Sequence, residues 1–169
     1  MSGTDDEVRQ VAELAKDIRI AMLTTVDDTG HFVSRPMAQQ EVEFDGDLWF
    51  FAEHDSRKVA QISANPVASV TLGSTDTWIS LSGTDTWICL SGTAKIVTDA
   101  AKAKQLWNPY VEAWLPQGPE DPSVVLIEFS SDTAEYWDTP GKIATALSFV
   151  KAKATGEPDQ GGENETVTM

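Results

Sequence analysis

The feature that most constrains this fold is a series of short apolar segments that follow one another through tight turns. Turn sequences such as Asp27–Gly30 and Asp45–Gly46 connect them, and long helices do not alternate with them. Strands connected in this way pair antiparallel, so the pattern favours an antiparallel barrel over a doubly wound parallel sheet. The expected strands are residues 20–26, 31–44, 47–53, 67–72, a segment around Trp78, 87–97, 124–129 and 134–137.

Four helices are expected around these strands. An apolar stripe and a possible cap at Thr4 indicate a helix over 5–19, and Asn65-Pro66 ends a second helix over 56–64. A third helix over 99–114 is interrupted near Pro109, and a fourth spans about 142–153. The chain has 169 residues, of which 41% are apolar, so we expect one α+β, mainly β domain over 1–154 and a flexible acidic tail over 155–169.

Charge and cysteine content exclude several classes of function. The formal net charge of −15 opposes general affinity for nucleic acid or anionic lipid. Cys89 has no second cysteine to pair with, and two isolated histidines give no metal-binding spacing, so no metal is expected. The sequence has no apolar run of about 18 residues, and its start is polar and acidic, so a cytoplasmic protein is expected.

A nine-residue segment occurs twice in tandem. Residues 75–83 read TDTWISLSG and residues 84–92 read TDTWICLSG. Nine is an odd number, so in one continuous strand the second copy would face the opposite side of the sheet, and Trp78 and Trp87 could not both be core residues. We therefore expect a turn near 82–85 and interpret the repeat as a duplication tolerated in a surface loop.

A candidate anion site follows from the expected hairpin. If Asp45-Gly46 is a two-residue turn, cross-strand partners have numbers that add to 91, and Arg35 lies opposite Ser56. Ser56, Arg57 and Lys58 also begin a helix, whose free N–H groups and partial positive charge favour an anion. Taken singly, each residue fits an ordinary cap or a solvated surface position. A bulge that shifts the register would remove the argument.

The aromatic residues allow two interpretations. Trp49, Phe50 and Phe51 could form the walls of an apolar slot for a planar ring, or they could belong to the core. Trp107 and Trp137 fit either a core or a subunit interface. The sequence has no GxSxG motif, no GxGxxG or GxxxxGKS/T motif and no catalytic pairing of His31 or His54, so hydrolase and nucleotide-loop chemistry have no support.

Several motifs together resemble one known family. SRPM at 34–37, NP at 65–66 and LSGTAKIV at 90–97 combine with LWFFAEHDSRKVAQI at 48–62, the LW…W…P pattern at 106–116 and EYWDTPG at 135–141. In order and spacing they resemble the general stress protein branch of the pyridoxamine 5′-phosphate oxidase-like superfamily, over residues 5–157. The resemblance implies an antiparallel Greek-key split β-barrel with flanking helices, which forms a homodimer and binds FMN at the subunit interface.

The resemblance also implies roles for particular residues. It assigns the FMN phosphate to Arg35, Ser56 and Lys58, with Arg57 in the same segment. Ala52 stands where many relatives have a hydroxyl residue, which would remove one phosphate contact. The isoalloxazine would face the backbone of Pro36, Met37, Phe50, Phe51 and Ala52, and Trp107 or Trp137 of the partner subunit would complete the pocket.

The function expected from this resemblance is a flavin-dependent oxidoreductase that takes hydride from NAD(P)H, with its substrate and catalytic residues unknown. Flavin supplies its own redox chemistry, so the protein needs no conventional acid–base group. Oxidation of pyridoxamine phosphate is disfavoured because no second basic cluster is present for a substrate phosphate. The alternatives are a non-catalytic flavin-binding stress protein or redox sensor, or a relative that binds deazaflavin or haem instead.

Overall fold

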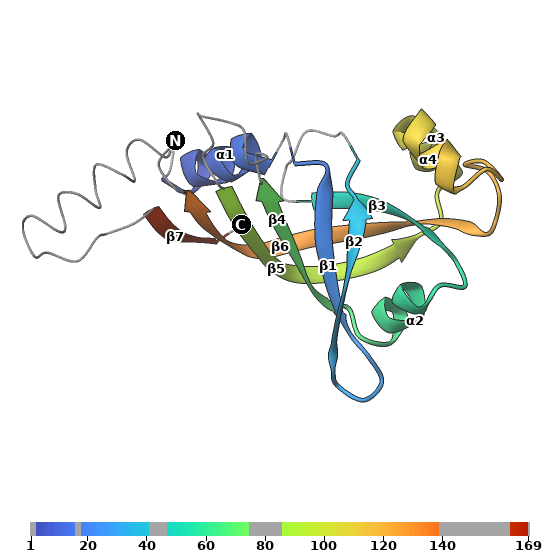
Figure 1. Ribbon diagram of the computed structural model, residues 1–169, viewed down its shortest axis with the longest axis horizontal. Helices are drawn as coiled ribbons and strands as arrows, with labels where there is room; N and C mark the ends of the chain where they lie inside the picture. Colours follow the sequence, from blue (N-terminus) through green and yellow to red (C-terminus); the bar gives the residue numbers. More distant parts are fainter. Residues whose placement is uncertain (1–2, 16–17, 41–46, 75–85, 139–162, 169) are drawn as a thin grey trace, which may run out of the picture.

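The computed structural model describes residues 3–15, 18–40, 47–74, 86–138 and 163–168 (Figure 1). Most of the described chain lies in strands, and short helices sit at the ends and on one side of the sheet. The elements are α1 (Gly3–Ala15), β1 (Ile20–Val26), β2 (Phe32–Ala38), β3 (Asp47–Glu53), α2 (Arg57–Ala64), β4 (Val67–Ser74), β5 (Thr86–Val97), α3 (Ala100–Leu106), α4 (Pro109–Trp114), β6 (Val124–Asp138) and β7 (Glu163–Thr168).

The strands form one antiparallel sheet that curls into a half-barrel (Figure 1). Their order is β2-β1-β4-β5-β6-β3, and β7 pairs with β6. β3 follows β2 in the chain but lies at the opposite end of this path, and the two edges meet at one bridge, Gln39 to Phe50. The mainly β, antiparallel split barrel predicted from the sequence is therefore confirmed.

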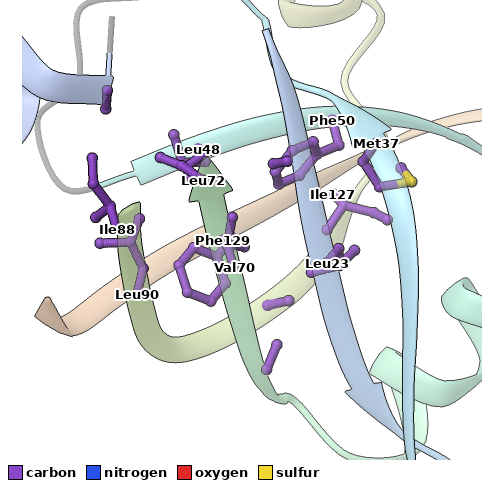
Figure 2. Close-up of a cluster of buried hydrophobic side chains, with 14 of the residues drawn as sticks. Leu23, Met37, Leu48, Phe50, Val70, Leu72, Ile88, Leu90, Ile127 and Phe129 are labelled. Carbon is purple, nitrogen blue, oxygen red and sulfur yellow. The ribbon is translucent and has the colours of Figure 1, made fainter. Parts of the chain in front are cut away.

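The inner face of the sheet carries the main core (Figure 2). Strand residues alternate between the two faces, so β1 buries Ala21, Leu23 and Thr25 while Ile20 and Met22 point outward. The helices α1 and α2 contribute apolar residues at helical spacing, such as Val59 and Ile62 of α2. Further inner residues labelled in Figure 2 are Met37, Leu48, Phe50, Val70, Leu72, Ile88, Leu90, Ile127 and Phe129.

A second apolar layer lies on the other side of β3. Trp49 and Phe51 point away from the main core and pack with buried residues of α3, α4 and β6. The predicted single helix over 99–114 is two helices, because Asn108 caps α4 by accepting from two backbone N–H groups and Pro109 occupies the first turn. Asp99 caps α3 in the same way.

β6 differs from its prediction as two strands. It is one strand over Val124–Asp138, and its pairing with β5 shifts between Ser91 and Gly92, so the polar residues 130–133 stay within the strand. The backbones approach so closely there that a Cβ on Gly92 would overlap the carbonyl oxygen of Ser130. A glycine is therefore required at this crossing.

The end of the chain also differs from its expectation. The tail over 155–169 was expected to be flexible, but residues 163–168 form β7, which pairs with β6 from Thr133 to Asp138. The Asp45-Gly46 turn, the first copy of the nine-residue repeat, the start of the second and the helix expected over 142–153 lie outside the described residues. The second copy continues in β5, where Trp87 is exposed on the outer face.

Candidate functional site

The candidate site forms where the ends of β1 and β2 meet α2. β1 and β2 pair with Leu23 opposite Arg35, and directly opposed residues share a face, so Arg35 points to the inner side of the sheet. α2 begins just after β3, with Arg57 and Lys58 in its first turn. The fold thus brings a strand arginine toward the start of a helix.

Arg35 is held by a compact polar network. Its Nη1 donates to Thr25 Oγ1 at 2.7 Å and to the Leu23 carbonyl at 3.3 Å. Its Nη2 donates to Gln61 Oε1 at 2.9 Å, and Thr25 Oγ1 donates to the same Gln61 oxygen at 2.7 Å. Thr25 is fully buried, so the hydroxyl that anchors this network is shielded from water.

Ser56 has the position of a helix cap but not its usual bond. Its backbone is extended and its carbonyl accepts from Val59 and Ala60, yet its hydroxyl makes no capping hydrogen bond. The Ser56 Oγ is buried and has no partner within the described part of the chain. Buried hydroxyls are normally satisfied, so this oxygen is free to bond a ligand at the start of α2.

Three positive charges gather at this point, and in the described residues none of them forms a direct ion pair with a carboxylate. Burial lowers the pKa of Lys58, the Arg35 charge lowers it further, and Glu53 acts in the opposite direction. Burial, followed by the charge of Arg57, likewise lowers the pKa of Arg35. We call Arg35, Arg57 and Lys58 the cation cluster.

The cation cluster and Ser56 suit a phosphate monoester. Arginine presents a planar fork that matches phosphate oxygens, lysine adds a point charge, and a helix start offers free backbone N–H groups. The orphaned Ser56 hydroxyl supplies one more hydrogen bond. Burial is the main cause of the lowered pKa values of Arg35 and Lys58, and repulsion between the cations is the second, which an anion there would relieve.

The register that led to this site from the sequence is wrong. A two-residue hairpin would give partner numbers that add to 91, but the observed bridge joins Gln39 and Phe50, and Gln40 N donates to the Trp49 carbonyl. Past that bridge, β2 pairs with β1 and β3 pairs with β6. Arg35 lies beside α2 because Thr25 of β1 bonds both Arg35 and Gln61 of α2. Arg35 is not a cross-strand partner of Ser56.

The residues expected near a flavin ring fall on different sides of the sheet. Met37, Phe50 and Ala52 are buried on the inner face, whereas Pro36 is exposed on the outer face. Because Phe50 is fully buried in the core, its side chain does not form the wall of an open slot. Phe51 faces the second apolar layer.

The two tryptophans expected at the site lie elsewhere in the subunit. Trp107 is half-buried between α3 and α4, with its ring edge-on to Phe51 at a centroid distance of 5.3 Å. Trp137 is exposed on the outer face, directly opposite Trp87 in the pairing of β5 with β6. In the described part of the chain, neither tryptophan makes a hydrogen bond or a cation–π contact with the cation cluster.

Sequence reasoning missed Thr25 and Gln61. Gln61 lies four residues after Arg57, on the same helix face, which indicates a place beside the cations. Thr25 has the same strand parity as Leu23 and is a polar residue in an inward-facing series. Those two patterns could have identified them, but their contact with Arg35 depends on how α2 packs against β1.

Other kinds of site have no support in the described residues. Within them, no group of three or more histidine, cysteine or acidic side chains is arranged to hold a metal ion. None of the helices that the structure describes is long and apolar enough to span a membrane.

Comparison with known proteins places the chain in a family. It matches the family described as pyridoxamine 5′-phosphate oxidase like over residues 6–159. It is 30% identical over 167 residues to the protein bli-3 of Neurospora crassa, and this match covers 91% of this chain and 76% of that protein.

Solved structures share the fold over most of its length. A candidate general stress protein 26 from Jannaschia sp. CCS1 superposes with a TM-score of 0.73 at 25% identity, covering 98% of this chain and 99% of the other. The general stress FMN/FAD binding protein of Xanthomonas citri gives a TM-score of 0.60 at 29% identity, covering 80% and 90%. The chain therefore belongs to the pyridoxamine 5′-phosphate oxidase-like family, in the branch of the general stress proteins that its motifs predict.

Proposed function

We propose that this protein is a cytoplasmic flavoprotein that holds the phosphate of FMN at the cation cluster. The observation that carries the proposal is the buried, unpartnered hydroxyl of Ser56 at the start of α2, beside Arg57 and Lys58. Arg57 repels Arg35 and Arg35 repels Lys58, so an anion bound among these cations would lower their mutual repulsion. Flavin binding by the Xanthomonas citri relative supports the choice of ligand.

Each residue of the site has a distinct part in this proposal. Arg35 and Lys58 neutralise the phosphate, and Ser56 donates its hydroxyl to a phosphate oxygen. The backbone near Pro36, Met37 and Phe50–Ala52 borders the ring. Ala52 offers no hydroxyl toward the ligand and is buried in the core.

We propose further that the chain acts as a homodimer whose interface lies on the outer face of the sheet. Six of the eight large, exposed hydrophobic residues in the described chain lie on that face, and monomers seldom expose so large an apolar surface. A partner that covers this face would bury Trp137 of both subunits in the interface. The six residues are Ile20, Met22, Phe32, Val67, Trp87 and Trp137.

The proposed activity is a flavin-dependent oxidoreduction with NAD(P)H as donor. When bound, the flavin supplies the redox chemistry, and the residues of this chain bind and orient it and exclude water. A non-catalytic flavin carrier or sensor would use the same site, so turnover separates the two functions.

The first experiment is a titration with FMN followed by flavin fluorescence. We expect saturable binding by the wild type and a loss of about thirtyfold for Arg35→Ala, since a hydrogen bond to a charged group contributes about 2 kcal/mol. Ser56→Ala should weaken binding by about tenfold, because a hydrogen bond from a hydroxyl to a charged phosphate oxygen contributes about 1.5 kcal/mol. Lys104→Ala is the matched control, since it removes one positive charge from α3 and leaves the cation cluster intact.

Four outcomes decide the proposal. Equal affinity of the wild type and Arg35→Ala for FMN would contradict the phosphate site. Binding of deazaflavin or haem in preference to FMN would keep the fold and change the ligand. Steady-state consumption of NAD(P)H by the FMN-loaded protein with an electron acceptor supports the oxidoreductase, and tight binding without turnover supports the carrier or sensor.

A further inference from the structure

Arg35 uses one edge of its guanidinium inside the protein and leaves another edge without a protein partner. Nη1 and Nη2, which form the terminal edge, donate to Thr25 Oγ1 and Gln61 Oε1. In the described chain, the Nε–H and the second N–H of Nη2 make no hydrogen bond. These two groups form the side edge of the guanidinium, which can hold two oxygens of one oxyanion.

The two acceptors are fixed by bonding to each other. Thr25 Oγ1 accepts from Arg35 and donates to Gln61 Oε1 at 2.7 Å, so its single hydrogen is already used. Gln61 Oε1 accepts one hydrogen bond from Thr25 Oγ1 and one from Arg35 Nη2. A flipped Gln61 amide would set its NH2 group against the arginine donor, so the three hydrogen bonds permit one amide orientation.

The network joins three separate elements. Thr25 comes from β1, Arg35 from β2 and Gln61 from α2, and Thr25 is fully buried. A long arginine side chain has much rotamer freedom, and a free arginine would lose it on binding a ligand. Held on its terminal edge, Arg35 has already lost that freedom before the ligand arrives.

We infer that Thr25 and Gln61 are positioning residues, which occupy the terminal edge of Arg35 and thereby present its side edge to the phosphate of the ligand. The inference rests on the proposed function, since it concerns how the same site recognises its phosphate. Neither residue needs to touch the ligand; both act through Arg35.

The test compares FMN with riboflavin, which lacks the phosphate. Gln61→Met keeps the length of the side chain and removes the acceptor. We expect it to weaken FMN binding about tenfold, as loss of a hydrogen bond to a charged group implies, and to leave riboflavin binding within about twofold. In an Arg35→Ala background, Gln61→Met should have no further effect on FMN. Gln105→Met, on the exposed side of α3, is the matched control.

A second pair of variants covers the case in which Gln61→Met fails to fold. Thr25→Ser keeps the hydroxyl and should retain the preference for FMN over riboflavin, whereas Thr25→Val has the same shape and should lose about tenfold of it. Thermal unfolding of each ligand-free variant shows whether it is folded.

The outcomes separate this inference from the function on which it rests. If the wild type binds riboflavin as tightly as FMN, the phosphate site itself is wrong. If the wild type prefers FMN and both Gln61→Met and Thr25→Val keep that preference, the positioning role alone is wrong. Equal losses for both flavins, or a full loss from Gln61→Met in the Arg35→Ala background, would also overturn it, because they indicate a general structural effect.

Discussion

The two faces of the same sheet contrast in what covers them. On β1 the inward residues Ala21, Leu23 and Thr25 have no exposed surface, whereas the outward residues Ile20 and Met22 are 55% and 40% exposed. Both sets are largely apolar, so β1 does not show the apolar–polar alternation of a strand with one wet face. A strand that is apolar on both sides is suited to burial on both sides, which is why we propose a partner for the outer face.

The inner face also differs from one end to the other. Most of it is closed by aliphatic and aromatic side chains, but near α2 the series ends in Thr25, Arg35 and Gln61. The apolar part stabilises the fold, and the polar end gives the cations a rigid base. We therefore propose that the apolar part of the inner face stabilises the fold and that its polar end recognises the ligand.

The largest expected effect is the loss of stability when a core side chain is shortened. Phe129 has no exposed surface, and Phe129→Ala should lower the free energy of unfolding by about 3–5 kcal/mol through lost burial and a residual cavity. Phe32→Ala is the matched change on the outer face, where the side chain is 79% exposed, and should cost under about 1 kcal/mol in the monomer. Urea unfolding at low protein concentration measures both. Similar losses of unfolding free energy in the two variants would contradict the view that only the inner face is buried in the monomer.

The next effect concerns association. Trp87 is 44% exposed, and its ring lies over Gly73 on the outer face. Trp87→Ala should raise the dimer dissociation constant about a hundredfold, as expected for a buried aromatic at the centre of an interface. Trp114→Ala is the control, because Trp114 is exposed on α4, away from the sheet. Sedimentation velocity across a concentration series gives both constants, and a wild type that stays monomeric throughout would refute the proposed interface.

A smaller effect tests the close approach of β5 and β6 at the register shift beside Gly92. Gly92→Ala would place a methyl group against the Ser130 carbonyl, so the paired strands must separate. We expect a loss of about 2 kcal/mol in unfolding free energy, the usual cost of overpacking. Ser91→Ala, at the neighbouring exposed position, should stay within about 0.5 kcal/mol. If Gly92→Ala unfolds like the wild type, the close crossing of β5 and β6 is not required.

Local pattern was enough for much of the fold. The sequence predicted strands over 20–26 and 47–53, and the structure has β1 and β3 at those bounds, because turn residues flank regular apolar segments. It divided β6 at the polar residues 130–133, since nothing local shows that a strand bends and continues through a bulge. It joined α3 and α4 because Asn108 interrupts an otherwise helical spacing for only two residues.

The site was less predictable, because it depends on packing between distant segments. Arg35 and the start of α2 were paired through a hairpin register that the Gln39–Phe50 bridge contradicts. The cations nevertheless come together, because β1 and α2 pack closely enough for Thr25 to bond Gln61. Patterns of neighbouring residues do not predict a contact between Thr25 and Gln61, which are far apart in the sequence. The network that holds Arg35 was therefore missed.

The smallest effect concerns pH at the polar end of the inner face. Burial and the nearby Arg35 charge hold the pKa of Lys58 below its ordinary value of 10.5, so the ligand-free protein loses this proton at a lower pH than an exposed lysine does. A bound phosphate dianion favours the protonated amine, so FMN affinity should fall, by about fivefold, as alkaline pH passes through the lowered pKa. The stability of the ligand-free protein changes in the opposite direction. Between the lowered pKa and 10.5 the unfolded chain binds more protons than the folded one, so stability rises with pH.

Lys58→Arg keeps its charge throughout this range, so its FMN affinity should stay level where that of the wild type falls. Riboflavin titrated in parallel subtracts the ionisation of the ring, which both flavins share. A wild type and a Lys58→Arg variant with the same alkaline profile would mean that Lys58 is not a phosphate ligand. The proposed recognition region at the polar end of the inner face would then consist of Arg35 and Ser56 without Lys58.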